Sequence, residues 1–241
     1  LSETGREAIE AGDGWGDADL FSGDVDWQKL LDVPPARLSE EEQAFIDGPV
    51  DELCAMLDDW KIIWEERELP AEVWKFLKEQ RFFGMIIPKR YGGLEFGPYA
   101  HSEVIRKIST RSVAAAVTAM VPNSPGPGEL ILQFGTDEQK ERWLPGLADG
   151  SEIPAFGLTS PEAGSDAASM TDAGIVCKGE YEGEEIIGMR LNWSKRYITL
   201  GPVATVLGLA FKLRDPDHLL SDVEERGITL ALVPTNTPGV A

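Results

Sequence analysis

Across roughly the first 150 residues, apolar side chains recur at intervals of three and four, which predicts helices that each bury one face. Ser39 and Glu42 have the spacing of a capping box and are expected to start one helix. Pro49 can occupy the first turn of the next. The apolar stripe expected to continue from there comprises Leu53, Met56, Leu57, Trp60, Ile63 and Trp64.

Further helices are predicted downstream. One opens at Pro70, and a long helix is expected to run from Pro98 toward Pro122. A short helix should end at Gly135. Thr136 stands three residues before a glutamine, so it should cap a final helix that ends before Gly150.

From about Ala155 the apolar pattern changes to a period of two, which is typical of strands. Helices followed by strands, without alternation, indicate an α+β fold. We expect an N-terminal extension at 1–35, a helical domain at 36–152 and a β-domain at 153–241. The expected strands are 175–181, 186–193, 196–199, 205–213 and 228–233, with a hairpin turn at 182–184.

Charge and composition narrow the function. The 241 residues carry 22 Lys and Arg against 42 Asp and Glu, a net charge of −20, which argues against nucleic-acid binding. Two cysteines make no disulfide framework, and no apolar run is long enough to cross a membrane. His101 and His218 lack a metal-ligand spacing, so no metal site is expected.

Two segments could carry chemistry. Within residues 156–166, a strand is expected to end at Thr159 and run into a loop of small residues, which could direct amides and hydroxyls at an anion. The alternative is an ordinary turn, in which Ser165 and Asp166 cap the chain locally. Further on, strand alternation would place Tyr197 and Thr199 on one face, where they could stack on a flat heterocycle and hydrogen-bond to it.

Together these segments resemble the acyl-coenzyme A dehydrogenase family, most closely its large bacterial members of fatty-acid β-oxidation. The resemblance extends along nearly the whole chain. Its four motifs are Phe83-Gly84-Met85-Ile86-Ile87-Pro88 with Tyr91-Gly92-Gly93-Leu94, Gly135 to Pro145, Leu158 to Asp166, and Lys195-Arg196-Tyr197-Ile198-Thr199.

This resemblance implies a fold in which the helical domain and an antiparallel β-domain hold FAD against a C-terminal helical domain that is missing here. The β-domain would itself be truncated at its end. Phe156 would border the flavin, Leu158 and Thr159 would contact its ring, and Gly164 and Ser165 would hold the pyrophosphate. Tyr197 would lie against the ring and Thr199 near its N5 edge. Thr118 and Val121 would line the acyl pocket.

The implied activity is oxidation of a saturated fatty acyl-CoA to the trans-2-enoyl-CoA, with electron-transferring flavoprotein as acceptor. The chain lacks an initial Met and stops just after a strand-like run, so we expect a fragment. The catalytic base would lie downstream of Ala241, leaving this piece inactive alone. The full-length protein would be a homo-oligomer in the cytoplasm, with peripheral attachment to the bacterial inner membrane left open. The alternatives are an acyl-CoA oxidase and a non-catalytic flavin-site remnant or binding module.

Overall fold

A computed structural model describes residues 20, 23–124, 126–181 and 183–241. The chain forms two compact units, Leu1–Arg37 and Leu38–Ala241. Within the first, helix α3 (Trp27–Leu31) begins at Asp26, whose carboxylate accepts hydrogen bonds from the amides of Gln28 and Lys29. The residues of the candidate site described below belong to the second unit.

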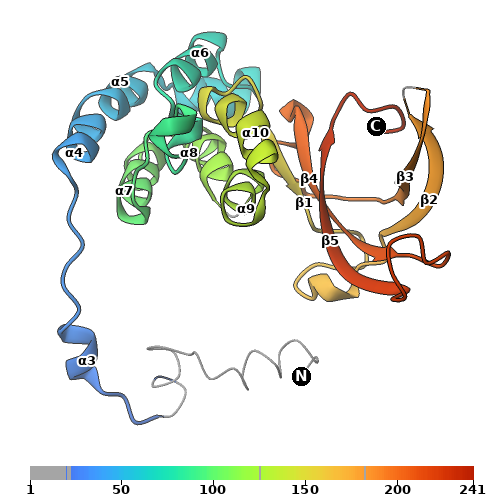
Figure 1. Cartoon of the computed structure of the whole chain (residues 1–241). Helices are drawn as coiled ribbons and strands as arrows, with labels where there is room; N and C mark the ends of the chain where they lie inside the picture. The colour runs from blue at the N-terminus through green and yellow to red at the C-terminus, as the bar shows by residue number, and fades with distance from the viewer. Residues whose placement is uncertain (1–19, 21–22, 125, 182) are drawn as a thin grey trace. The chain divides into compact units, whose positions relative to one another are not determined.

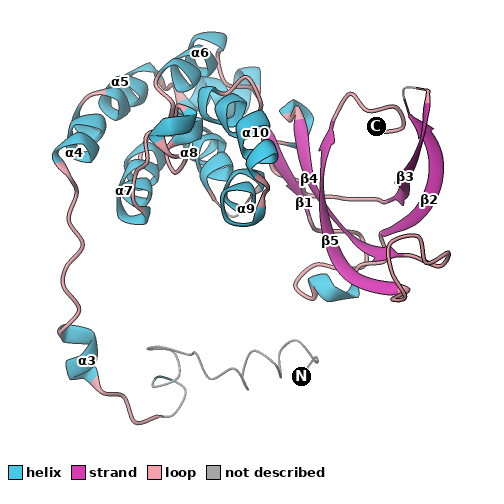
Figure 2. Cartoon of the chain, viewed as in Figure 1, coloured by secondary structure: helices cyan, strands magenta, loops and turns pink. Residues whose placement is uncertain are grey.

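The second unit begins with helices and ends with strands, as expected (Figure 1 and Figure 2). Both predicted capping boxes are present, at Ser39 and at Thr136, and Gly150 ends the last helix with a φ of 73°. The helices are α4 (Glu40–Asp47), α5 (Pro49–Met56), α6 (Ala71–Glu79), α7 (Pro98–Ser109), α8 (Val113–Met120), α9 (Pro127–Phe134) and α10 (Asp137–Asp149).

Two helix predictions were wrong in detail. The long helix after Pro98 is two helices, because the chain turns at Thr110 and the hydroxyl of Ser112 caps α8. The apolar stripe after α5 also breaks. Leu57 adopts an extended conformation, and the next turn is a π-helix at Lys61–Glu66, so the helical phase changes. Ile62 is buried there, whereas Trp60, Ile63 and Trp64 are exposed.

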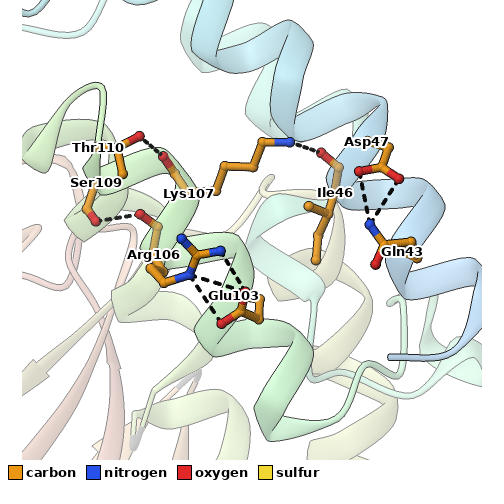
Figure 3. Close-up of polar contacts among 8 residues, drawn as sticks. All are labelled: Gln43, Ile46, Asp47, Glu103, Arg106, Lys107, Ser109 and Thr110. Atoms are coloured by element: carbon orange, nitrogen blue, oxygen red, sulfur yellow. Dashed lines mark hydrogen bonds and ion pairs between the residues drawn. The ribbon is translucent and has the colours of Figure 1, made fainter. Parts of the chain in front are cut away.

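The side chain of Lys107 connects α7 to the helices that precede it (Figure 3). The ammonium group of Lys107 donates to the carbonyl of Ile46 at 2.8 Å. The same ammonium group pairs with Asp51 of α5 at 2.8 Å. Arg106 instead pairs with Glu103 within α7 itself. The apolar side of these helices forms a core that includes Leu53 and Val104, neither of which is exposed to solvent.

A five-stranded sheet follows the helices, with β4 at its centre. β4 pairs in parallel with β1 and with β2, and antiparallel with β5, while β2 and β3 form an antiparallel hairpin. The sheet is therefore mixed rather than wholly antiparallel, because β4 starts beside the start of β1 and runs the same way. The strands are β1 (Pro154–Gly157), β2 (Ala173–Tyr181), β3 (Glu184–Asn192), β4 (Val206–Arg214) and β5 (Glu225–Pro234).

The turn expected at 182–184 joins β2 to β3, and Gly183 in it has a φ of 84°. Glu182 lies outside the described residues. Strand 228–233 is confirmed as part of β5, and the strand expected at 205–213 is confirmed from Val206 onward as part of β4. By contrast, residues 196–199 are loop rather than strand.

Helices and sheet share one apolar cluster. Ile131, Leu144 and Leu147 from the last two helices pack with Val206 of β4 and the partly buried Leu232 of β5. The 3-10 turn Val121–Asn123 and α9 also contact β1. This junction positions the end of β1, from which the first candidate segment leaves the sheet.

Candidate flavin site

The loop after β1 is closed by its own backbone. The amide of Ser160 donates to the carbonyl of Ala163 at 3.1 Å, and the amide of Ala163 donates back to Ser160 at 3.2 Å. Leu158 packs against buried Ala163 and Met170. Small residues permit this tight closure, and the residues that follow it are left at the surface.

Beyond this closed turn, the loop presents unused donors. Gly164, Ser165 and Asp166 are exposed, and their three consecutive amides donate to no other described residue. A side-chain Cβ built at Gly164 would meet nothing within 4 Å. Consecutive free amides beside a small exposed hydroxyl suit an anion such as a phosphate.

The loop's carboxylates take local roles. Asp166 accepts a hydrogen bond from the hydroxyl of Ser169, and Glu162 accepts one from Thr171 at 3.5 Å. Asp166 precedes the 3-10 turn Ala167–Ser169, but its carboxylate makes no capping hydrogen bond to the backbone of that turn, so the structure does not show the expected local cap. Ser165 makes no such contact within the described part of the chain, so its hydroxyl remains available.

The second segment follows β3, and its backbone differs from the expected strand. Tyr197 and Leu200 adopt left-handed φ values of 57° and 62°, which interrupt an extended conformation. Tyr197 is 83% exposed, and the guanidinium carbon of Arg196 lies 4.9 Å from the centre of its ring. Thr199 is also exposed. The ring and hydroxyl thus remain at the surface, although strand alternation does not place them there.

The fold brings the two segments together. The amide of Arg196 donates to the carbonyl of Thr159 at 3.1 Å, and the ammonium group of Lys195 donates to the carbonyl of Leu158 at 2.9 Å. Neither the amide nor the hydroxyl of Thr159 makes a hydrogen bond to another described residue. The amide of Leu158, however, is already 3.0 Å from the carbonyl of Phe156.

The structure separates Phe156 from these groups. Its side chain lines an apolar pocket of about 600 Å³ between α9 and the strands β4 and β5. Leu158, Thr159, Ser165, Tyr197 and Thr199 do not line that pocket. The other lining residues include Phe134, Trp143 and Leu232.

Val121, one of the two residues expected to line an acyl pocket, lies near β1. Val121 belongs to the 3-10 turn that contacts this strand. Thr118 is buried, and its hydroxyl donates to the carbonyl of Ala114 at 2.9 Å within the same helix. The Thr118 hydroxyl is therefore engaged in the helix, while its remaining atoms contribute to packing.

Asp172 is the residue that sequence reasoning missed. Its carboxylate pairs with Lys195 at 2.6 Å, and both side chains are almost fully buried. The pKa of Asp172 lies below its usual value. Burial alone would raise this pKa, but the hydrogen bonds from Lys195 and the Ser194 amide, together with the Lys195 charge, outweigh that effect. The buried hydroxyl of Ser160 makes the smallest contribution, in keeping with its lack of a well-formed hydrogen bond. A lone Asp before an apolar run carries no signal that could identify its partner.

Other chemistries find no support in the described residues. No cluster of His, Cys, Asp and Glu there could hold a metal ion. His101 is half-buried, and burial lowers its pKa, while His218 is exposed. No described helix has the length and apolar character required to cross a bilayer.

The donor set fits a flavin nucleotide. Free amides at 164–166 suit a pyrophosphate, and an exposed aromatic ring suits a flat heteroaromatic system. The hydroxyls of Thr159, Ser165 and Thr199 make no hydrogen bond within the described residues and can donate to a ligand. The hydrogen bonds from Lys195 to Leu158 and from Arg196 to Thr159 connect the loop that contains Thr159 to the loop that contains Tyr197 and Thr199.

Known proteins resemble this chain over both its helical and its β parts. Residues 39–151 match the N-terminal domain of acyl-CoA dehydrogenases, and residues 155–241 match their middle domain. An acyl-CoA dehydrogenase of Bacillus subtilis is 34% identical over 74% of this chain and 43% of its own length. A 3-(aryl)acrylate reductase of Clostridium sporogenes is 33% identical over 72% of this chain and 42% of its own.

A solved structure gives the same picture. The glutaryl-CoA dehydrogenase of Mycobacterium smegmatis in complex with FADH2 superposes with a TM-score of 0.64 at 26% identity, covering 84% of this chain and 47% of that one. The chain thus spans less than half the length of these relatives. With both domain models matched in order along its length, the chain belongs to the acyl-CoA dehydrogenase family.

Proposed function

We propose that this chain supplies the FAD-binding portion of an acyl-CoA dehydrogenase that converts saturated fatty acyl-CoA to trans-2-enoyl-CoA. One observation carries the proposal: the hydrogen bond between Arg196 and Thr159 joins two segments that both present unused donors or an exposed ring. Family members are flavoprotein oxidoreductases, which makes FAD the ligand that suits this surface.

In this proposal each segment has its own task. The amides at 164–166 and the Ser165 hydroxyl bind the pyrophosphate. Thr159 donates to the flavin ring, the ring of Tyr197 lies against it, and Thr199 donates at its edge. Phe156 borders the flavin only if its side chain also reaches beyond the pocket that it lines.

FAD, when bound, supplies the acceptor for the hydride that leaves the acyl β-carbon. This chain's residues bind and orient it, and none of them is assigned the proton abstraction. Glu162 and Asp166 are engaged in contacts within their loop, so neither is a candidate for the base. We propose that the base lies in sequence outside these 241 residues.

The choice of substrate rests on the resemblance to the large bacterial enzymes. The relatives differ in substrate, since they include an aryl acrylate reductase and a glutaryl-CoA dehydrogenase. Val121 presents an apolar side chain in the turn beside β1, which is compatible with an acyl chain. Electron-transferring flavoprotein is the acceptor we propose, and a homo-oligomer is the proposed assembly.

The test uses the protein expressed from its complete reading frame. We expect it to be purified with bound FAD, whose absorbance falls when a long-chain acyl-CoA is added without oxygen. Butyryl-CoA and glutaryl-CoA, added in parallel, report the chain-length preference. A protein that acquires no FAD even from excess cofactor contradicts the proposal and favours a binding module. Rapid oxygen consumption, without transfer to electron-transferring flavoprotein, would indicate an oxidase.

A further inference from the structure

A buried ion pair adjoins the first flavin-binding segment. The ammonium group of Lys195 lies 2.6 Å from a carboxylate oxygen of Asp172, and the two side chains are 2% and 3% exposed. Removing two charges from water is costly, and a buried pair often contributes no more stability than apolar residues of similar size. We therefore consider which backbone groups the Asp172–Lys195 pair holds in position.

Each partner makes a further bond to the backbone. The Lys195 ammonium also donates to the carbonyl of Leu158 at 2.9 Å. The second carboxylate oxygen of Asp172 accepts from the amide of Ser194 at 2.8 Å. The carbonyl of Asp172 accepts from the amide of Lys212 in β4 at 2.9 Å. The pair therefore connects the Leu158 segment to the central strand.

These bonds determine the direction of one peptide group. The peptide between Leu158 and Thr159 is trans, so its C=O and N–H point in opposite directions. Because the C=O is directed at buried Lys195, the N–H of Thr159 is directed away from it. The carbonyl of Thr159 is held in turn by the amide of Arg196, while its N–H has no partner among the described residues.

We propose that the Asp172–Lys195 ion pair is a positioning element of the flavin site, which orients the Leu158–Thr159 peptide so that the Thr159 N–H faces the flavin. This inference rests on the proposed function, in which Thr159 contacts the ring. A donor held in place by the fold needs no reorganisation when negative charge appears on the ring. It therefore stabilises the reduced cofactor and raises its reduction potential.

A double substitution in the full-length protein separates positioning from stability. Lys195→Met alone would leave a buried carboxylate unpaired and could unfold the domain. Asp172→Asn with Lys195→Met removes both charges and keeps an acceptor for the Ser194 amide, but the Leu158 carbonyl loses its donor. We expect the unfolding temperature of the apoprotein to approach that of the wild type. FAD should bind about tenfold more weakly, with a more negative reduction potential.

The matched control removes an exposed ion pair from the same sheet. Lys178 and Glu185 lie 3.6 Å apart across β2 and β3, and both side chains are largely exposed. Lys178→Met with Glu185→Gln should leave FAD affinity, reduction potential and unfolding temperature unchanged.

Three results would overturn the inference. A folded double variant with wild-type FAD affinity and potential would show that the ion pair is only structural. Failure of the unmodified protein to bind FAD would instead refute the proposed function, and the inference with it. If the double variant does not fold, residue-resolved hydrogen exchange on the unmodified protein decides. The Thr159 amide should exchange rapidly without FAD and slowly with it, and protection already present without FAD would contradict the proposal.

Discussion

The amide of Arg196 donates a hydrogen bond to the carbonyl of Thr159 at 3.1 Å, and this contact joins the loop after β1 to the loop after β3. Each loop alone is an ordinary connection between strands. Held side by side, they bring Thr159, whose hydroxyl has no partner among the described residues, next in space to the residue that precedes the exposed Tyr197.

Removing two hydroxyls from the candidate site should weaken FAD binding without unfolding the protein. Ser165→Ala and Thr199→Val each delete an exposed group with no partner in the described chain, so the fold should tolerate both. Each loss should reduce FAD binding by about 1–3 kcal/mol if the partner is charged. Fluorescence titration of the full-length apoprotein with FAD measures this. Ser102→Ala, at an exposed position on α7, is the control, and unchanged affinity in the double variant would show that the site is wrongly assigned.

Two adjacent glycines should differ in their tolerance of a side chain. A Cβ at Gly93 would lie 2.0 Å from the carbonyl oxygen of Ile87, a backbone clash that requires the segment to move. Gly92 has a φ of 86° but open space around it, so Gly92→Ala should cost about 1–2 kcal/mol through its backbone conformation alone. Urea unfolding should show Gly93→Ala to be clearly the less stable variant. Equal stability would mean that the segment adopts another conformation.

The start of α10 depends on its capping box. The Thr136 hydroxyl accepts from the amide of Gln139 at 3.2 Å, and the Gln139 side chain accepts from the Thr136 amide at 2.9 Å. Thr136→Ala should lower the free energy of unfolding by about 1 kcal/mol, while Thr136→Ser should retain most of it. Thermal unfolding compares the two, and a serine variant as unstable as alanine would contradict capping by the hydroxyl.

Asp215 should make stability depend on acidic pH. The pKa of this carboxylate lies below its usual value. Burial alone would raise the pKa, but hydrogen bonds from the amides of Leu220, Leu219 and Ser221 outweigh that effect. A lowered pKa in the folded state means that the stabilisation is present at neutral pH and is lost as pH falls through about 4 and below.

Asp215→Asn should therefore be less stable at pH 7, because an amide nitrogen replaces one accepting oxygen. It should also lose less stability than the wild type between about pH 5 and pH 3. Urea unfolding at several pH values measures both effects. Asp222→Asn, at an exposed position in the same loop, is the control, and parallel curves for wild type and Asp215→Asn would refute the assignment.

Local signals accounted for much of the fold. The two capping boxes, Pro49 at the start of α5 and the turn before Glu184 all depend on residues close in sequence. The prediction of one apolar stripe through Trp60 and Trp64 was wrong because a break at Leu57 changed the helical phase. No local sequence pattern indicates this break. Likewise, the order of the strands and the parallel pairing around β4 depend on contacts between distant segments.

The sequence by itself determined the succession of helices and strands, the family motifs and the residues that could bind a flavin, because these depend on residue type and short-range spacing. Only the tertiary structure decided that Lys195 is buried against Asp172 and that Tyr197 belongs to a loop. A long side chain can point to solvent or into the core from the same local sequence. Which it does depends on whether a distant carboxylate and a distant carbonyl are brought within hydrogen-bonding distance, as Asp172 and Leu158 are here.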